Sequence, residues 1–128
     1  MKLNIKKLIV KKDARGWLAE VISQEDVDKK KFGLVLITTA RPGQVKGNHY
    51  HKKKKEWYCV IKGRGLLRIW RENTDENKEL EIGERNMVLV EIPTGYFHSI
   101  KALGNQEMYL LAYMSEAFNP SSPDTYYE

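Results

Sequence analysis

Short segments in which apolar and polar residues alternate dominate this 128-residue chain. Such alternation places every second side chain on one face of an extended strand and indicates a half-buried β-strand. Turn residues separate the segments, and strand signals recur about every 8 to 12 residues, which favours an all-β sandwich or barrel. The pattern predicts strands near Asn4–Val10, Trp17–Ser23, Gly33–Ala40, Lys46–His51, Glu56–Lys62, Leu66–Glu72, Lys78–Ile82, Asn86–Glu91, His98–Ala102 and Glu107–Ser115.

Two segments depart from this alternation. The pattern predicts a short helical segment of about two turns over Gln24–Lys31. The last residues, Met114–Glu128, lose the alternation but carry three aromatic residues that are too apolar for a solvated end, and so predict an ordered C-terminal tail: Phe118, Tyr126 and Tyr127. No repeat or linker interrupts the chain, and we expect one domain over residues 1–128.

The segment Glu56–Lys62 is apolar on both of its faces. A strand of this kind is covered on both sides, which predicts an oligomer interface or a swapped terminal segment on the outside. Burying Glu56 without a partner would be costly, whereas binding a cation relieves that cost. One face carries Glu56, Tyr58 and Val60, and the other carries Trp57, Cys59 and Ile61.

Composition places the chain among ordinary globular proteins, with 41% apolar and 30% charged residues. No apolar run approaches the roughly 20 residues that span a membrane, and lysines interrupt the apolar residues of Met1–Lys12, unlike those of a signal peptide. The single cysteine, Cys59, excludes a disulfide within the chain and fits a reducing compartment. We therefore expect a cytoplasmic location and no membrane partner.

The net charge of +5 has three interpretations. Surface enrichment in lysine and glutamate is one, and attraction of an anionic substrate such as a nucleotide sugar is another. Nucleic-acid binding is the third, but no nucleic-acid-binding motif accompanies the charge, and we expect no nucleic-acid partner. The run Lys52–Lys55 is expected to form a solvated hairpin turn.

All three histidines fall inside two short patterns that are spaced like metal ligands. The first reads Gly43-x5-His49-x-His51-x4-Glu56-x6-Gly63, and the second reads Pro93-x-Gly95-x2-His98. Residues i and i+2 of a strand share a face, so His49 and His51 can converge on one point. Three imidazoles and a carboxylate suit zinc, iron, manganese, nickel or copper, and are too nitrogen-rich for magnesium or calcium. The alternative is a barrel with vestigial ligands, or a hydrogen-bonded polar core.

These two patterns resemble the signature segments of the cupin superfamily, which are small β-barrels whose neighbouring strands supply metal ligands. The first pattern matches at every fixed position, and the second has Met87 and Ala102 where glycine and asparagine are usual. Within the superfamily the chain resembles the C-terminal cupin domain of capsular-polysaccharide enzymes and, more distantly, the dTDP-4-dehydrorhamnose 3,5-epimerases. The residues that carry this likeness are Gly47–His51, Ile92–His98 and the tail Phe118–Tyr126.

The resemblance implies an all-β, single-domain cupin-type β-barrel, also called a double-stranded β-helix or jelly roll, that forms a homodimer. It implies an epimerase or isomerase of a nucleotide-linked 4-keto-6-deoxy sugar in cell-surface polysaccharide biosynthesis. Such a reaction needs a base, a stabiliser of the enolate oxygen and an acid. We expect the metal, with zinc favoured, to be bound by His49, His51, Glu56 and His98. The catalytic candidates are Tyr50, Tyr58 and Lys46. The substrate-binding candidates are Arg15, Arg41, Arg68 and Tyr96.

The resemblance also contains a conflict. In the rhamnose-pathway epimerases the histidine that matches His49 is the base and no metal is bound, and the position that matches His51 is not histidine. The related 3,4-ketoisomerases keep the paired histidines but generally lack a carboxylate like Glu56. The epimerase tyrosine before the tail proline is replaced here by Ala117 and Phe118. Two rival functions stay open: a non-catalytic cupin that binds a sugar or nucleotide sugar, and another metal-cupin enzyme such as a dioxygenase or a sugar-phosphate isomerase.

Overall fold

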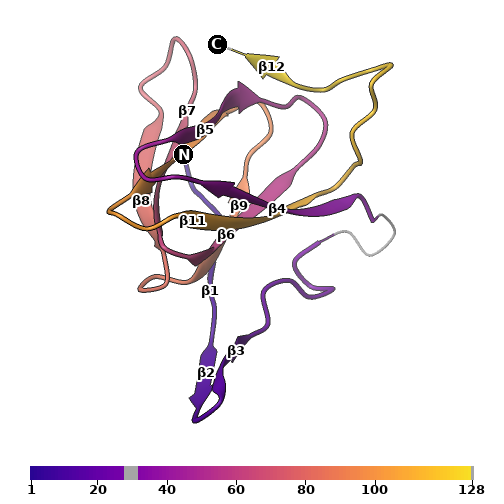
Figure 1. Ribbon diagram of the computed structural model, residues 1–128. Helices are drawn as coiled ribbons and strands as arrows, with labels where there is room; N and C mark the ends of the chain where they lie inside the picture. Colours follow the sequence, from indigo (N-terminus) through magenta and orange to yellow (C-terminus); the bar gives the residue numbers. More distant parts are fainter. Residues whose placement is uncertain (28–31, 128) are drawn as a thin grey trace.

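A computed structural model of the chain describes residues 1–27 and 32–127. The described residues form strands and turns and include no α-helix (Figure 1). Across this part of the chain no helical segment could therefore cross a membrane. The strands are β1 (Ile5–Lys7), β2 (Val10–Asp13), β3 (Gly16–Ala19), β4 (Leu34–Ala40), β5 (Val45–Tyr50), β6 (Glu56–Lys62), β7 (Arg64–Trp70), β8 (Asn77–Gly83), β9 (Val88–Ile92), β10 (Phe97–Leu103), β11 (Met108–Met114) and β12 (Tyr126–Tyr127).

Two five-stranded antiparallel sheets make up the barrel. The first has the strand order β1-β9-β6-β11-β4, and the second has the order β12-β5-β10-β7-β8. Consecutive strands β5, β6 and β7 alternate between the two sheets, which is how a jelly roll closes its ends. The predicted all-β cupin barrel is confirmed.

A single apolar cluster fills the space between the two sheets. Both sheets contribute to it, because every second residue of each strand points inward. Its buried members are Ala40, Tyr58, Val60, Leu67, Ile69, Ile82, Val88, Val90, Ile92, Ile100, Ala102, Met108, Leu110 and Ala112.

A second cluster covers the outer face of the first sheet. It contains Trp57 and Cys59 from β6, with Leu8 from the N-terminal segment packed against them. The prediction that β6 is covered on both sides is confirmed, and within this chain the cover comes from its own N-terminal residues. Burial raises the pKa of the Cys59 thiol to about 11, so this side chain is an inert apolar residue.

Three local predictions need correction. The segment Asn4–Val10 is split between β1 and β2, because the chain leaves β9 after Leu8, whose amide still bonds Met87, and pairs with β3 from Val10 onward. Gln24–Val27 forms a turn and a bend instead of the start of a helix, and the rest of that predicted helix lies outside the described residues. Lys52–Lys55 is not a hairpin turn: it connects β5 in one sheet to β6 in the other.

The tail is ordered as predicted, but it also adds a strand. Residues Tyr126 and Tyr127 form β12 and pair with Tyr50 and His49 at the edge of β5. Phe118 and Tyr127 nevertheless remain largely exposed, so the aromatic residues are not the sole reason for the order of the tail.

A β-bulge in β5 sets the direction of the first two histidines. Lys46 pairs with Ile100 and His49 pairs with His98, so Asn48 is an extra residue on β5. Both Gly47 (φ 98°) and Asn48 (φ 61°) adopt positive φ. The bulge puts Lys46 and His49 on the same, inward face although they are three residues apart.

Replacing Gly47 with alanine should disturb the second sheet at its ligand-bearing strand. A Cβ there would lie 2.7 Å from the carbonyl oxygen of His98, in addition to the strain of positive φ. Gly43→Ala is the matched control, since Gly43 has φ 82° and open space around a Cβ. We expect urea unfolding to show a loss of about 1 kcal/mol for Gly43→Ala and clearly more for Gly47→Ala. Equal losses would mean that the bulge tolerates a side chain.

Candidate metal centre

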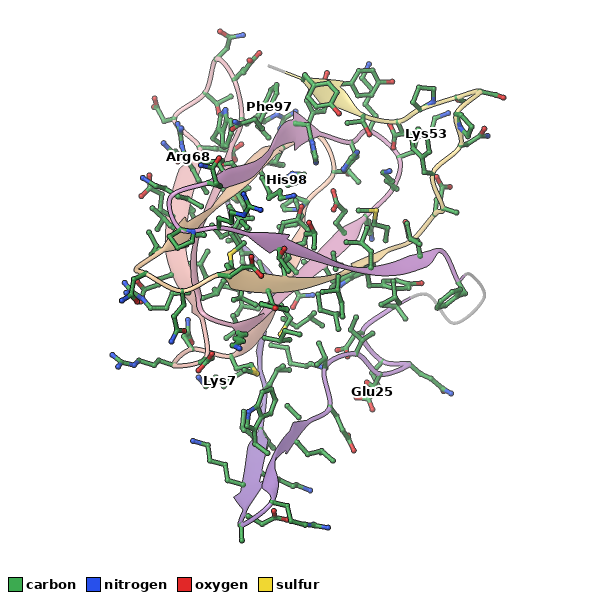
Figure 2. All side chains as sticks on the ribbon, viewed as in Figure 1. Lys7, Glu25, Lys53, Arg68, Phe97 and His98 are labelled. Carbon is green, nitrogen blue, oxygen red and sulfur yellow. The ribbon has the colours of Figure 1, made fainter. Side chains whose placement is uncertain are left out.

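Four side chains meet at one end of the barrel core. His49 lies on β5 and His51 directly after it, Glu56 begins β6, and His98 lies on β10. One possible ligand atom from each of these residues lies within 4.8 Å of the other three. Figure 2 shows His98 among the side chains enclosed by the two sheets. The two sequence patterns therefore converge in space, as predicted.

Burial leaves the centre short of hydrogen-bond partners. Glu56, His98 and His51 are 1%, 0% and 5% exposed. Nε2 of His51 and of His98 and both carboxylate oxygens of Glu56 lack a hydrogen-bond partner within the described part of the chain. Nε2 of His98 is 3.1 Å from Oε1 of Glu56, and Nε2 of His51 approaches the same oxygen.

Backbone carbonyls hold two of the imidazoles in one orientation. Nδ1 of His51 is 2.6 Å from the carbonyl oxygen of Asp124, and Nδ1 of His98 is 3.3 Å from that of Tyr96. A carbonyl can only accept, so each Nδ1 carries a proton and each Nε2 is left to face Glu56. A cation held between these facing atoms would compensate the buried carboxylate. Four convergent ligands match the usual coordination number of zinc, so the residues fit a metal.

The electrostatics of the centre favour ligand-ready side chains. Burial lowers the pKa of His49 to about 4, with the neighbouring His98 and His51 acting in the same direction, so this imidazole is neutral at pH 7. Burial alone would raise the pKa of the Glu56 carboxyl, but the close nitrogens of His51 and His98 outweigh it and hold that pKa far below its ordinary value. An ionised carboxylate and neutral imidazoles are the forms that bind metals.

Tyr58 lies against the same centre. Its ring meets the ring of His98 edge-on, with centroids 5.6 Å apart. Burial, and then the charge of Glu56, raise the pKa of the Tyr58 hydroxyl well above its usual value. The phenol therefore keeps its proton and can donate it, but it cannot act as a base at neutral pH.

The other two predicted catalytic residues lie on opposite faces of β5. Lys46 is exposed on the inward face of β5, the face that carries His49. Tyr50 falls on the opposite face, where its ring contacts Phe97 and stacks on Tyr126. The structure does not bring Tyr50 to the cluster, because alternation along β5 directs its side chain out of the barrel.

Among the predicted substrate-binding residues, Tyr96 touches the cluster, through the contact of its backbone carbonyl with Nδ1 of His98. Arg68 is on the outer face of β7 over the ring of Trp70, and Arg41 is exposed in the loop after β4. The Tyr96 hydroxyl donates to Glu76 over 2.7 Å. Arg15 lies in the turn between β2 and β3 and is paired with Asp13. The hairpin of β2 and β3 projects from the barrel (Figure 1).

Two residues near the centre were missed from the sequence. Asp124 holds the loop after His51, and Lys54 is buried within a run that predicted exposed lysines. No spacing rule links a tail residue to a loop 70 residues earlier, so only the fold could reveal Asp124. Tyr113, on the strand before the tail, packs with Trp57 on the outer face of the first sheet and so does not take the place of an epimerase tyrosine at the cluster. Ala117 and Phe118 are exposed.

The barrel and its cluster define a cupin with a histidine- and carboxylate-lined centre. The family model described as the polysaccharide biosynthesis C-terminal domain matches residues 11–126, and the chain belongs to this family.

Curated relatives carry names from the same field of biosynthesis. Spore coat polysaccharide biosynthesis protein SpsL of Bacillus subtilis is 28% identical, covering 95% of this chain and 84% of that protein. UDP-2-acetamido-2,6-beta-L-arabino-hexul-4-ose reductase of Pseudomonas aeruginosa is 31% identical, over 89% of this chain and 29% of that protein. Probable low-salt glycan biosynthesis epimerase Agl13 of Haloferax volcanii is 28% identical, over 95% of this chain and 83% of that protein.

A solved structure supports the same assignment. The capsular polysaccharide assembling protein CapF of Staphylococcus aureus is 34% identical, with a TM-score of 0.72 over 94% of this chain and 34% of that one. The chain thus spans about a third of the length of CapF and of the reductase.

The low pKa of His49 predicts how the metal-free protein responds to acid. The His49 imidazole has a pKa near 6.5 in the unfolded protein and about 4 in the folded protein. Between these two pH values the unfolded state therefore binds more protons than the folded state. Stability therefore falls as the pH is lowered from 6.5 to 4. Urea midpoints of chelator-treated protein across this range should show the loss, and His49→Asn should reduce its slope. An unchanged slope would contradict a buried neutral His49.

Proposed function

We propose that this chain is a metal-dependent epimerase or isomerase of a nucleotide-linked 4-keto-6-deoxy sugar in cell-surface polysaccharide biosynthesis. The observation that carries the proposal is the convergence of His49, His51, Glu56 and His98 on one point. Within the described residues, the facing atoms of His51, Glu56 and His98 are buried there without hydrogen-bond partners. An apolar core does not maintain such a group without a compensating cation.

These four residues would hold the metal, and zinc is the favoured ion because a mixed nitrogen and oxygen set of four suits it. When bound, a transition metal would supply a Lewis acid that polarises a ketone oxygen, provided that it accepts this oxygen in addition to the four side chains. This chain's residues contribute the imidazoles and the ionised carboxylate, while the two backbone carbonyls fix the directions of His51 and His98.

Proton transfer falls to side chains beside the ligands. Tyr58 keeps its proton at neutral pH and is the candidate donor. Lys46 shares the inward face of β5 with His49 and, being exposed, can meet a substrate that enters from solvent. Tyr50 drops out of this role, because its ring is engaged on the outer face.

The substrate class is supported by the family and by the names of relatives. The Pseudomonas reductase is named for a UDP-linked hexul-4-ose, which is a nucleotide-linked 4-keto sugar. Agl13 is named as an epimerase, and it matches this chain over most of its own length. The net charge of +5 suits an anionic diphosphate, and Arg41 remains exposed to receive one.

A homodimer would explain the apolar surface of the N-terminal hairpin. Trp17 and Leu18, both on β3, are 51% and 58% exposed, and Ile9, directly before β2, is 76% exposed. The hairpin of β2 and β3 projects from the barrel (Figure 1). Exposed apolar residues gathered in this way mark an association surface. The resemblance to the epimerases places an arginine such as Arg15 near substrate phosphate in the dimer.

Sedimentation equilibrium should therefore give a dimer mass for the chain, and Trp17→Asp should shift it toward the monomer. Lys12→Asp, on the strand that pairs with Trp17, is the matched control. A wild-type monomer at micromolar concentration would contradict the homodimer.

A second candidate is a non-catalytic cupin that binds a nucleotide sugar. The observation that favours it is the exposed Ala117 and Phe118 at the place of the epimerase tyrosine. This candidate keeps the metal and the ligand but predicts no enolisation.

Elemental analysis combined with solvent exchange distinguishes these functions. Protein purified without a metal-affinity tag should carry one transition metal per chain and should incorporate deuterium from D2O into a nucleotide-linked 4-keto-6-deoxy sugar. His51→Ala should remove both, because it deletes a ligand, whereas Tyr58→Phe should keep the metal and slow exchange about 100-fold or more. Tyr50→Phe is the control and should change neither.

Each failure has a separate meaning. Full metal content in His51→Ala would overturn the ligand set. Metal without exchange across UDP- and dTDP-linked substrates would establish the binding protein in place of the enzyme.

A further inference from the structure

The C-terminal tail contacts the candidate metal centre through one residue, Asp124. Its two carboxylate oxygens accept hydrogen bonds from three consecutive backbone amides: Lys52 at 3.0 Å, Lys53 at 2.8 Å and Lys54 at 2.9 Å. Figure 2 shows Lys53 close to the tail. Burial alone would raise the pKa of the Asp124 carboxyl, but these hydrogen bonds outweigh it and lower that pKa.

The backbone of the same residue acts on a ligand. The carbonyl oxygen of Asp124 is 2.6 Å from Nδ1 of His51. This contact requires a proton on Nδ1 and leaves Nε2 to face Glu56. An isolated neutral histidine in water has no such constraint, so the tail selects the tautomer that can bind a metal.

Further contacts seat the tail in the position where this carbonyl meets His51. Tyr126 stacks on Tyr50 with ring centroids 5.1 Å apart, and Lys52 places its ammonium 4.3 Å from the centroid of Tyr126. Tyr127 pairs with His49 in β12 and touches its ring edge-on. The tail therefore lies along both histidines of the first pattern.

We infer that Asp124 is a positioning residue for the metal centre, and that docking of the tail and binding of the metal stabilise each other. The carboxylate fixes the loop at 52–54, this fixes the carbonyl of Asp124, and the carbonyl fixes His51. Because linkage is reciprocal, a metal that needs the docked tail must also tighten its docking. The inference rests on the metal site of the proposed function, but the tautomer of His51 can be measured without metal.

Asp124→Ala removes all three amide contacts, and Glu116→Ala removes an exposed acid of the same tail as the matched control. Zinc affinity, measured by competition with a chelator, should fall about 10- to 100-fold for Asp124→Ala and less than about twofold for Glu116→Ala. Hydrogen exchange at the Lys52–Lys54 amides should slow when zinc binds to the wild type, and this slowing should be lost in Asp124→Ala.

Nitrogen NMR of His51 in metal-free protein at about pH 8, above the ordinary pKa of histidine, provides the independent readout. The wild type and Glu116→Ala should show the proton on Nδ1, and Asp124→Ala should show a mixture with the Nε2 form. Equal zinc affinity in the two variants, together with an unchanged His51 tautomer, would overturn the inference.

Two further variants cover a failure of Asp124→Ala to fold. Asp124→Asn keeps one accepting oxygen, and Tyr126→Ala removes the stacking on Tyr50 but leaves the carboxylate. Both should shift zinc affinity and the tautomer in the same direction by smaller amounts, and no shift in either would overturn the inference. If the wild type binds no metal, the proposed function fails, and the NMR and amide protection still decide the role of Asp124.

Discussion

The architecture of this protein depends on one buried carboxylate, Glu56, facing the imidazoles of His51 and His98 inside an apolar barrel. An isolated ion in such a place costs several kcal/mol, and hydrogen-bonded backbone groups on the far side of each ring prevent the imidazoles from turning away to relieve it. In the function that we propose, a bound cation joins the facing atoms and offsets this cost. The rest of the fold serves to keep these atoms together: the bulge at Asn48 turns His49 inward, and the sheet-switching loop brings Glu56 opposite it.

Much of this was accessible from the sequence because it rests on local periodicity. Alternation located most strands, including the limits of β6, and it assigned the two faces of β6 to the residues that the structure buries on each side. The spacing of His49, His51, Glu56 and His98 predicted the cluster, since a period of two puts the first pair on one face and the resemblance supplied the rest.

What the sequence could not provide depends on contacts between distant segments. The alternation that predicts strands also directs Tyr50 away from His49 and His51. The structure places the Tyr50 ring against Tyr126, on the face opposite the cluster. Lys54 lies within a charged run, and only the path of the tail explains its burial. The split between β1 and β2 follows from a change of partner strand, from β9 to β3, which no propensity scale contains.

The metal centre that we propose would change how proton chemistry must be organised. A nitrogen that binds a metal cannot remove a proton, so a barrel that uses His49 as a ligand has to place its acid and base elsewhere. Tyr58 meets the requirement for an acid because the same burial that makes Glu56 costly also keeps the phenol protonated. Lys46 reaches the inward face only because of the extra residue Asn48. The bulge thus does two things at once: it aims a ligand into the core, and it leaves a cationic side chain on the same face at the solvent boundary.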